Sequence, residues 1–185
     1  LKQANWQADS NLHDIASHAL AKIHHTEHLA DSHLMKHFNT IQALVNKGSV
    51  HDIDAALRDE NFTKVNGEAD KWLTKAVETY QHGCPVSAAL TVEMFKHASK
   101  LSLEQVLYME MNASLHCVNY PDFREGVRAL LIDKDKSPKW SKTLDECDAR
   151  YIQSHLASAF PNSEHPFESW LGSDSLSAKL AKLAV

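Results

Sequence analysis

The sequence contains few of the residues that turn a chain sharply. Five glycines and five prolines occur among 185 residues, less than half of the usual share of about 12%. Sandwiches and barrels need many tight turns between short strands, so this scarcity argues against both classes. The five glycines also cannot be combined into either of the common glycine-rich phosphate-binding motifs. We therefore expect a chain that is mostly helical.

Cysteine, long apolar runs and excess positive charge are also scarce or missing. The three cysteines lie far apart, which predicts reduced thiols in an intracellular protein rather than a disulfide framework. No apolar run approaches the roughly 18 residues of a membrane span. With 19 Lys and Arg against 24 Asp and Glu, the net charge of −5 argues against nucleic-acid binding. We therefore expect neither a membrane nor a nucleic acid as a partner.

Apolar residues recur at the three- and four-residue spacing of amphipathic helices along most of the chain. In one segment, the face expected to point inward carries Leu34, Phe38, Ile41 and Val45, and Gly48 suits a left-handed C-terminal cap. We predict an all-α fold, a compact bundle of about eight short helices. The residue ranges expected to be helical are 12–23, 32–45, 50–57, 68–82, 85–97, 103–117, 123–132, 144–156 and 176–183.

We expect one helical domain over residues 1–185. It divides by composition into a His-rich helical segment over residues 1–60, a helical core over 61–158, and a loop with a terminal helix over 159–185. The polar stretch 59–67 is expected to be a connector. Four residue pairs have the spacing of a capping box, in which two side chains bind the free backbone N–H groups of a helix start. They are Ser49 with Asp52, Ser102 with Gln105, Asp122 with Glu125, and Thr143 with Glu146.

Histidine is abundant near the N-terminus, where seven of the 13 fall between His13 and His37. On a helix, His24 and His28 would share one face, as would His33 and His37, a geometry that can bind a divalent metal. No HExxH motif occurs and no third ligand has an assigned position. Imidazoles that face solvent are the preferred interpretation, and we predict no metal site.

Neither nucleophile motifs nor paired acids reveal a reaction centre. The GxSxG elbow is absent, and the clustered acids at 52–54 and 145–148 lie where helix starts favour negative charge. From composition and spacing alone, the chain is a helical domain in which we predict no catalytic residue.

One segment is unusual: residues 122–140 read DFREGVRALLIDKDKSPKW. Gly126 falls inside a helix start, where it costs roughly 1 kcal/mol relative to Ala, and a helix accepts that when another backbone must come close. Lys134, Lys136 and Lys139 follow the apolar helix end and precede Trp140. Lysines beside a flat apolar ring could hold a phosphorylated, adenine-bearing ligand. The alternative is a helix end whose lysines counter the C-terminal dipole.

The same segment resembles the C-terminal signature of the enoyl-CoA hydratase/isomerase (crotonase) superfamily, in particular its 3-hydroxyisobutyryl-CoA hydrolase branch. Upstream, CPVS over residues 84–87 and LSLEQVLYME over 101–110 agree with it. The resemblance is specific over residues 84–140 and vague over the first 60 residues and the tail after Leu156.

The resemblance implies that this whole chain corresponds to a helical C-terminal region that follows an N-terminal spiral of ββα turns. The spiral would supply the backbone oxyanion hole and the acidic residues that act on an acyl-CoA thioester. Nothing here matches that half, so no catalytic residue is carried over. In the family a Phe and a Lys lie near the adenine of coenzyme A, and their positions here are held by Leu130 and Asp133. Lys134, Lys136 and Lys139 are the candidate coenzyme A contacts, with Lys134 best placed to substitute.

These implications give a leading hypothesis and several alternatives. The leading one is the C-terminal helical domain of an acyl-CoA thioester hydrolase of valine catabolism, covering the coenzyme A site, supporting assembly and inactive alone. Its partners would be the spiral and the acyl-CoA substrate, with a homo-oligomer also open. It would use no cofactor beyond the coenzyme A of the substrate. The alternatives are a hydratase or isomerase of the same superfamily, an independent protein-interaction module and a His-dependent metal binder. We expect a cytoplasmic location, or the mitochondrial matrix in a eukaryote.

Overall fold

A computed structural model of the chain describes residues 12–22, 31–160 and 165–167. Its contacts divide the chain into two units, Leu1–Ile41 and Gln42–Val185. The first unit contains helices α1 (Leu12–Ala21) and α2 (His33–Lys36), and α3 (Phe38–Val45) crosses the boundary. The predicted division at residues 60 and 158 stays a prediction. The predicted terminal helix over 176–183 and the His24/His28 pair lie outside the described residues.

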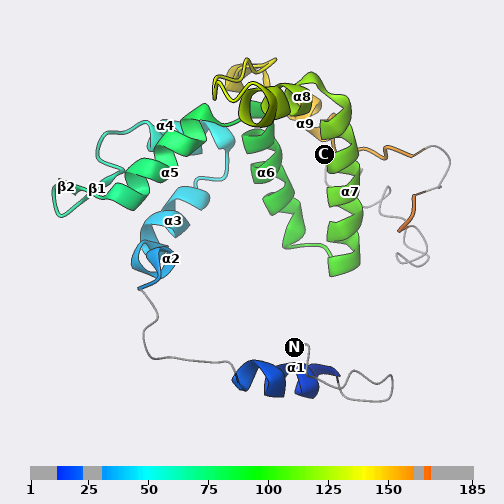
Figure 1. Ribbon diagram of the computed structural model, residues 1–185, viewed down its shortest axis with the longest axis horizontal. Helices are drawn as coiled ribbons and strands as arrows, with labels where there is room; N and C mark the ends of the chain where they lie inside the picture. The colour runs from blue at the N-terminus through cyan, green and yellow to red at the C-terminus, as the bar shows by residue number, and fades with distance from the viewer. Residues whose placement is uncertain (1–11, 23–30, 161–164, 168–185) are drawn as a thin grey trace. The chain divides into compact units, whose positions relative to one another are not determined.

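The second unit is a succession of short helices (Figure 1). None of the helices in the described part of the chain is both long and apolar enough to span a bilayer. The helices are α4 (Val50–Leu57), α5 (Lys71–His82), α6 (Pro85–Ala98), α7 (Leu103–Asn119), α8 (Pro121–Val127), the π-helix η1 (Arg128–Ile132), the 3-10 helix η2 (Leu144–Glu146) and α9 (Ala149–Ser154).

The core of the second unit joins α6, α7 and α9. Met109, on α7, is completely buried, and Ala113 lies one turn further along the same face. Because the two residues are four apart, they present one continuous stripe to the neighbouring helices. The buried members of the cluster are Val86, Ala89, Leu90, Met109, Ala113, Cys147, Ile152 and Leu156.

Several predicted helix ends are confirmed. The hydroxyl of Ser102 accepts a hydrogen bond from the backbone N–H of Gln105 (3.3 Å), and the Gln105 side chain accepts from the backbone of Ser102 (3.0 Å). The Ser49 hydroxyl accepts from the backbone N–H of Asp52 at 3.1 Å and so caps α4, but the Asp52 carboxylate binds the Ser49 hydroxyl instead of its backbone N–H, so only half of this predicted box forms. Gly48 adopts the left-handed conformation with φ +79°. Thr143 and Glu146 also form their box, but it opens the three-residue η2, whereas α9 starts after Asp148.

The stretch predicted to be a connector contains a small antiparallel hairpin. Strands β1 (Lys64–Val65) and β2 (Glu68–Ala69) pair Lys64 with Ala69 and Val65 with Glu68. Asn66 and Gly67 form the turn with φ +53° and +85°, the left-handed pair that suits a two-residue hairpin loop. The hairpin takes residues 68 and 69 from the predicted helix, so α5 starts at Lys71, with Asp70 as its N-cap.

The predicted helix over residues 32–45 is interrupted at His37, between α2 and α3. Leu34, Phe38 and Val45, expected to point inward, are 62%, 52% and 53% exposed. That expectation is wrong for these three side chains, because amphipathic spacing identifies an apolar face without supplying a surface that covers it.

The central position of Met109 gives a test of this core. Met109→Ala should lower the free energy of unfolding by about 2–5 kcal/mol, because truncation of a fully buried side chain leaves a cavity. Leu103→Ala on the same helix is the matched control, since Leu103 is 70% exposed and its truncation should stay within about 0.5 kcal/mol. Urea denaturation followed by circular dichroism measures both. Equal midpoints for the two variants would contradict the placement of Met109.

Candidate functional site

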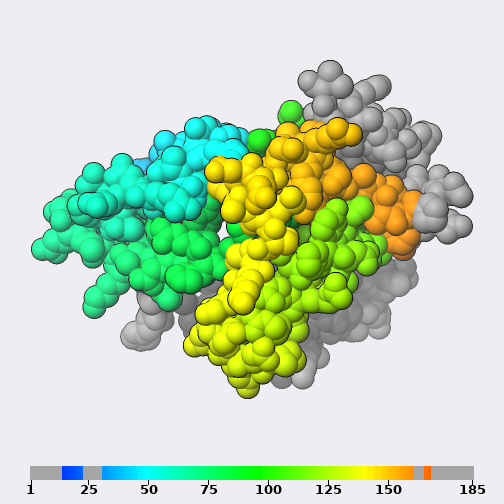
Figure 2. Space-filling model, turned by 90° about the horizontal axis from the view of Figure 1, so that it is seen from above, coloured from blue at the N-terminus to red at the C-terminus, as the bar shows by residue number. Residues whose placement is uncertain are grey.

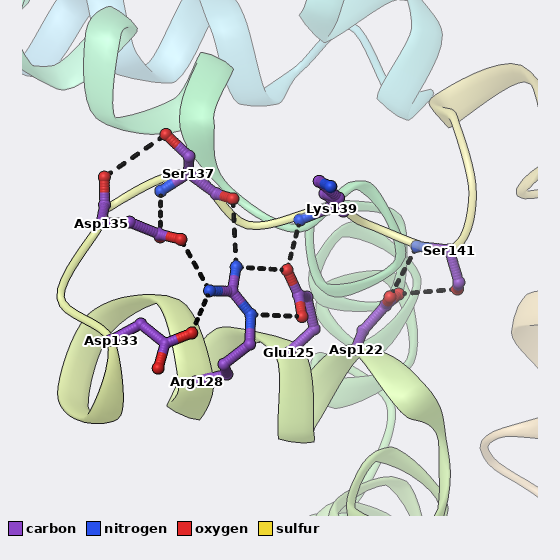
Figure 3. A network of polar contacts seen from close by, with 8 residues as sticks. All are labelled: Asp122, Glu125, Arg128, Asp133, Asp135, Ser137, Lys139 and Ser141. Carbon is purple, nitrogen blue, oxygen red and sulfur yellow. Dashed lines mark hydrogen bonds and ion pairs between the residues drawn. The ribbon is translucent and has the colours of Figure 1, made fainter.

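Residues 122–141 fold back on themselves around the guanidinium of Arg128 (Figure 3). Arg128 is the first residue of η1. Its Nε and Nη2 donate to the two carboxylate oxygens of Glu125 at 2.9 and 2.8 Å. The paired, nearly parallel geometry is the strongest form of arginine–carboxylate contact. Arg128 and Glu125 lie one helical turn apart, so the pair stabilises the junction of α8 and η1.

The other side of the same guanidinium holds the following loop. Nη1 of Arg128 donates to Asp133 at 2.7 Å and to Asp135 at 2.6 Å, and Nη2 reaches the carbonyl oxygen of Ser137 at 3.3 Å. Asp135 in turn accepts from the backbone N–H of Ser137 at 2.9 Å. One arginine therefore fixes three carboxylates and the course of residues 133–137.

Glu125 is the carboxylate most affected by this arrangement. Hydrogen bonds from Arg128 and from the backbone N–H of Lys139 (2.7 Å) lower its pKa from 4.5 to about 2. The same contacts raise the pKa of Arg128, and Arg128 lowers that of Asp135. All of these groups are therefore ionised at neutral pH, which suits a structural network and not a proton donor.

Asp122 is buried and also holds the loop. Its carboxylate accepts from the backbone N–H of Ser141 at 2.7 Å, from the Ser141 hydroxyl at 3.1 Å and from the Cys84 thiol at 3.5 Å. The predicted capping box of Asp122 with Glu125 is thus wrong. Helix α8 starts at Pro121 with Tyr120 as its N-cap, and both carboxylates bind a segment that the sequence pattern did not place beside them.

Gly126 leaves room for the indole of Trp140. A Cβ atom at Gly126 would lie 3.4 and 3.6 Å from two atoms of that ring. The close approach expected at this glycine is therefore present, but it comes from a side chain instead of a backbone. The indole N–H donates to the carbonyl oxygen of His82 at 3.2 Å, so Trp140 links the end of this loop to the end of α5.

The three candidate lysines lie on this loop and are exposed. Lys134 and Lys136 have positive φ angles of 58° and 55°, and the backbone N–H of Lys136 donates to the carbonyl oxygen of Ala129 at 3.0 Å. Lys136 lines a cavity of about 600 Å³ together with residues of α5, whereas Lys134 and Lys139 do not line it. The structure therefore distinguishes Lys136 from the other two.

A second cavity, of about 360 Å³, lies between α6, α7, α8 and Trp140. Its polar groups include the thiols of Cys84 and Cys117 and the imidazole of His155. Burial raises the pKa of both thiols and lowers the pKa of His155. Half-buried thiols with a raised pKa are poor nucleophiles at neutral pH, so this arrangement does not form an activated cysteine–histidine pair.

Sequence reasoning named the lysines of the segment, assigned Asp122 to a helix cap and missed Arg128, although Asp122 and Arg128 are the residues that hold the loop. The available signal was the run of acids at 122, 125, 133 and 135 around one arginine. Across the described ranges, no three His, Cys, Asp or Glu side chains are grouped so as to hold a metal ion.

The low pKa of Glu125 predicts how stability depends on pH. A carboxylate whose folded pKa lies below its ordinary value stabilises the fold above that value and loses the contribution as pH falls. The urea midpoint of the unmodified chain should therefore drop between pH 4.5 and 2, the window set by the two pKa values of Glu125. In Glu125→Gln the drop should be smaller, because that residue no longer titrates.

Glu110→Gln, at an exposed position of α7, is the matched control and should keep the full pH dependence. Identical pH profiles for Glu125→Gln and the unmodified chain would show that the Arg128 pair is not formed in solution.

Comparisons with known proteins identify the family. A sequence model described as enoyl-CoA hydratase/isomerase matches residues 1–156. The mitochondrial 3-hydroxyisobutyryl-CoA hydrolase of Danio rerio is 38% identical over 126 residues, which cover 68% of this chain and 31% of that protein. That of Dictyostelium discoideum is 38% identical over 102 residues, 54% of this chain and 27% of the relative. The chain thus spans about three tenths of the length of these relatives.

Two further similar proteins have names other than 3-hydroxyisobutyryl-CoA hydrolase. The small ribosomal subunit protein mS47 of Schizosaccharomyces pombe is 34% identical over 97 residues, 52% of this chain and 22% of that protein. The crystal structure of an enoyl-CoA hydratase from Rhodobacter sphaeroides superposes with a TM-score of 0.60 at 22% identity, over 80% of this chain and 42% of the other. That likeness concerns the fold. Since the family model matches most of the residues, the chain belongs to the enoyl-CoA hydratase/isomerase (crotonase) family, and its sequence resembles the 3-hydroxyisobutyryl-CoA hydrolases within it.

Proposed function

We propose that this chain is the C-terminal helical region of an acyl-CoA thioester hydrolase, with 3-hydroxyisobutyryl-CoA as the substrate. The observation that carries the proposal is the 38% identity to the hydrolase of Danio rerio over 126 residues. The described helices hold no activated nucleophile and no metal cluster. In this proposal, the reacting groups belong to a spiral domain of the same protein, whose backbone N–H groups polarise the thioester carbonyl.

Exposed apolar side chains on α8 and η1 are evidence that another domain packs against this surface. Phe123, Leu130, Leu131 and Ile132 are between 52% and 70% exposed; the last three are consecutive, and Phe123 lines one cavity with Leu130 and Leu131. A contiguous apolar patch of this kind marks a surface that packs against another domain or protein. We propose that the spiral covers it, and that the helices in return support the coenzyme A site.

The network around Arg128 gives these helices a further role in the proposal. It fixes the loop that carries Lys134, Lys136 and Lys139, the residues that we propose as coenzyme A contacts. A loop held by four charged side chains loses little conformational freedom when a ligand binds, which favours affinity. Among the three lysines, Lys136 has the strongest support because it lines a cavity. We place the protein in the cytoplasm or, in a eukaryote, in the mitochondrial matrix; the names of several relatives describe those proteins as mitochondrial.

A non-catalytic role is the second candidate, and a specific observation favours it. The relative from Schizosaccharomyces pombe is named as a protein of the small ribosomal subunit, so similar sequence occurs in a protein whose name describes a component of a complex and not an enzyme. In that case the exposed apolar surface would bind a protein partner and no thioester would be hydrolysed.

An assay of thioester hydrolysis separates these candidates. The 185-residue chain alone should release no coenzyme A from 3-hydroxyisobutyryl-CoA, while the complete protein that contains it should do so. Release of free thiol, followed with a chromogenic disulfide reagent, measures both; hydration of an enoyl-CoA, followed by loss of its ultraviolet absorbance, is the parallel assay.

Hydrolysis by the chain alone would refute the assignment of the reacting groups to another domain. Hydration without hydrolysis by the complete protein would replace the hydrolase with a hydratase. A complete protein inactive in both assays would favour the assembly role.

A further inference from the structure

A further cavity follows one face of α6, away from the segment held by Arg128. It has a volume of about 580 Å³, within the range of small-molecule sites, and no described residue between 122 and 141 lines it. Figure 1 shows α4 on one side of α6 and α7 on the other. The cavity, here the α4–α6 groove, is lined on α4 by Val50, Ile53 and Leu57 and on α6 by Ala88, Val92 and Phe95.

Helix α6 is apolar on two faces, and only one of them belongs to the core. Ala89 and Leu90 are buried against α7 and α9. Ala88, Val92 and Phe95 follow each other at spacings of four and three residues, so they form a second stripe, along the groove. A helix at a protein surface ordinarily carries polar residues opposite its core face, whereas Phe95 is 69% exposed. The second stripe is therefore an apolar surface that a ligand can cover.

The groove is long and narrow. The α6 residues that line it run from Cys84 to Lys96, which corresponds to about 18 Å of helix. Spread over that length, the volume of about 580 Å³ gives a channel roughly 6 Å across, about half the diameter of a helix with its side chains. A second helix is too wide to enter such a channel, but an extended alkyl chain is not.

The polar groups in the walls already have partners within the protein. The hydroxyl of Tyr80 donates to Asp54 at 3.1 Å, and the hydroxyl of Thr91 donates to the carbonyl oxygen of Ser87 at 2.8 Å. An apolar ligand therefore leaves these two donors hydrogen-bonded. The rest of the channel is mainly aliphatic, and the transfer of an alkyl chain from water onto such a surface is favourable.

A positive charge lies at one end of the groove. Lys96, in the last turn of α6, is the only charged side chain among the described residues that line it. Its Nζ lies 3.1 Å from a carboxylate oxygen of Glu93, on the same helix, and the Lys96 side chain is 47% exposed. Ion pairs at such exposure contribute little energy, so the ammonium can turn to a bound anion. The charge thus complements a ligand with an alkyl chain and a negative group at one end.

We propose that the α4–α6 groove binds a free, unbranched alkyl carboxylate, with its chain between α4 and α6 and its carboxylate at Lys96. This ligand differs from the substrate of the proposed function, because a thioester carries no charge at the head of its acyl chain. The site also uses none of the residues 122–141. It stands whether or not the complete protein hydrolyses a thioester.

Calorimetric titration of the 185-residue chain tests the chemistry of the ligand with three probes, each kept below the concentration at which micelles form. Dodecanoate should bind. Dodecyltrimethylammonium has the same chain with the opposite charge, and it should bind at least tenfold more weakly. Butyrate has the carboxylate without the long chain, and it should not bind at millimolar concentration.

Matched variants connect binding to the groove. Lys96→Gln should weaken dodecanoate binding about fivefold or more, while Lys100→Gln, at an exposed position outside the groove, should leave it within twofold. Ala88→Trp fills the channel and should weaken binding at least tenfold, whereas Ala55→Trp, at an exposed position of α4 outside the groove, should not. Urea midpoints of the two lysine variants should equal that of the unmodified chain, so their comparison stands even where Ala88→Trp lowers its own midpoint.

Nuclear Overhauser contacts between dodecanoate and protein methyl groups locate the bound chain. The alkyl protons should contact Ile53 and Val92. Contacts with Leu131 and not with these two residues would place the chain on the exposed surface of α8 and η1, which would overturn the proposal.

The proposal is also overturned if dodecanoate does not bind, if the cationic probe binds equally well, or if Lys100→Gln has the same effect as Lys96→Gln. A ligand-free dimer that Phe95→Ala converts to a monomer would assign the groove to a second copy of the chain instead. Because none of these measurements involves turnover, a failed hydrolysis assay would leave them intact.

Discussion

The course of residues 122–141 depends on the hydrogen bonds and ion pairs that the guanidinium of Arg128 makes. This guanidinium joins Glu125 on the preceding helical turn to Asp133 and Asp135 on the loop that follows. Removal of the arginine would bring three carboxylates close together without a counter-charge, so the loop could not keep its course. The positions of Lys136 and Trp140 both follow from that course. Figure 2 shows this loop, in yellow, crossing the second unit between its green and its yellow-green parts.

The residues that make this segment recognisable are mainly structural. Asp122 binds Ser141, Glu125 binds Arg128 and the backbone of Lys139, and Gly126 leaves space for an indole. Such residues identify a family because they maintain a shape, and a shape can serve more than one activity. This explains how a hydrolase and a ribosomal protein can both be similar to this chain. Family membership is thus a statement about the fold of these helices, and in the proposed function the reacting groups lie on another domain.

Local signals determined much of the fold. Helices α4 and α7 begin after Ser49 and Ser102, whose hydroxyls accept from free backbone N–H groups, and Gly48 adopts the left-handed conformation that other residues avoid. The Asn66–Gly67 pair was an equally local signal, because this pair favours a two-residue hairpin turn. The strands beside it have only two residues each, too few to show an alternating apolar pattern. The exposed Leu34 and Phe38 show the limit of periodicity, because a pattern defines an apolar face but not its partner.

By itself, the sequence determined that the chain is helical, where most helices start and which segment is unusual, because these properties depend on residues within about five positions of each other. Only the tertiary structure decided that Asp122 binds Ser141 and not a helix end, that Trp140 fills the space at Gly126, and that Lys136 and Lys75 line one cavity. Each of these contacts joins residues from 14 to about 60 positions apart. A carboxylate has several donors within its reach in a folded chain, and the choice among them is made by the packing of whole helices.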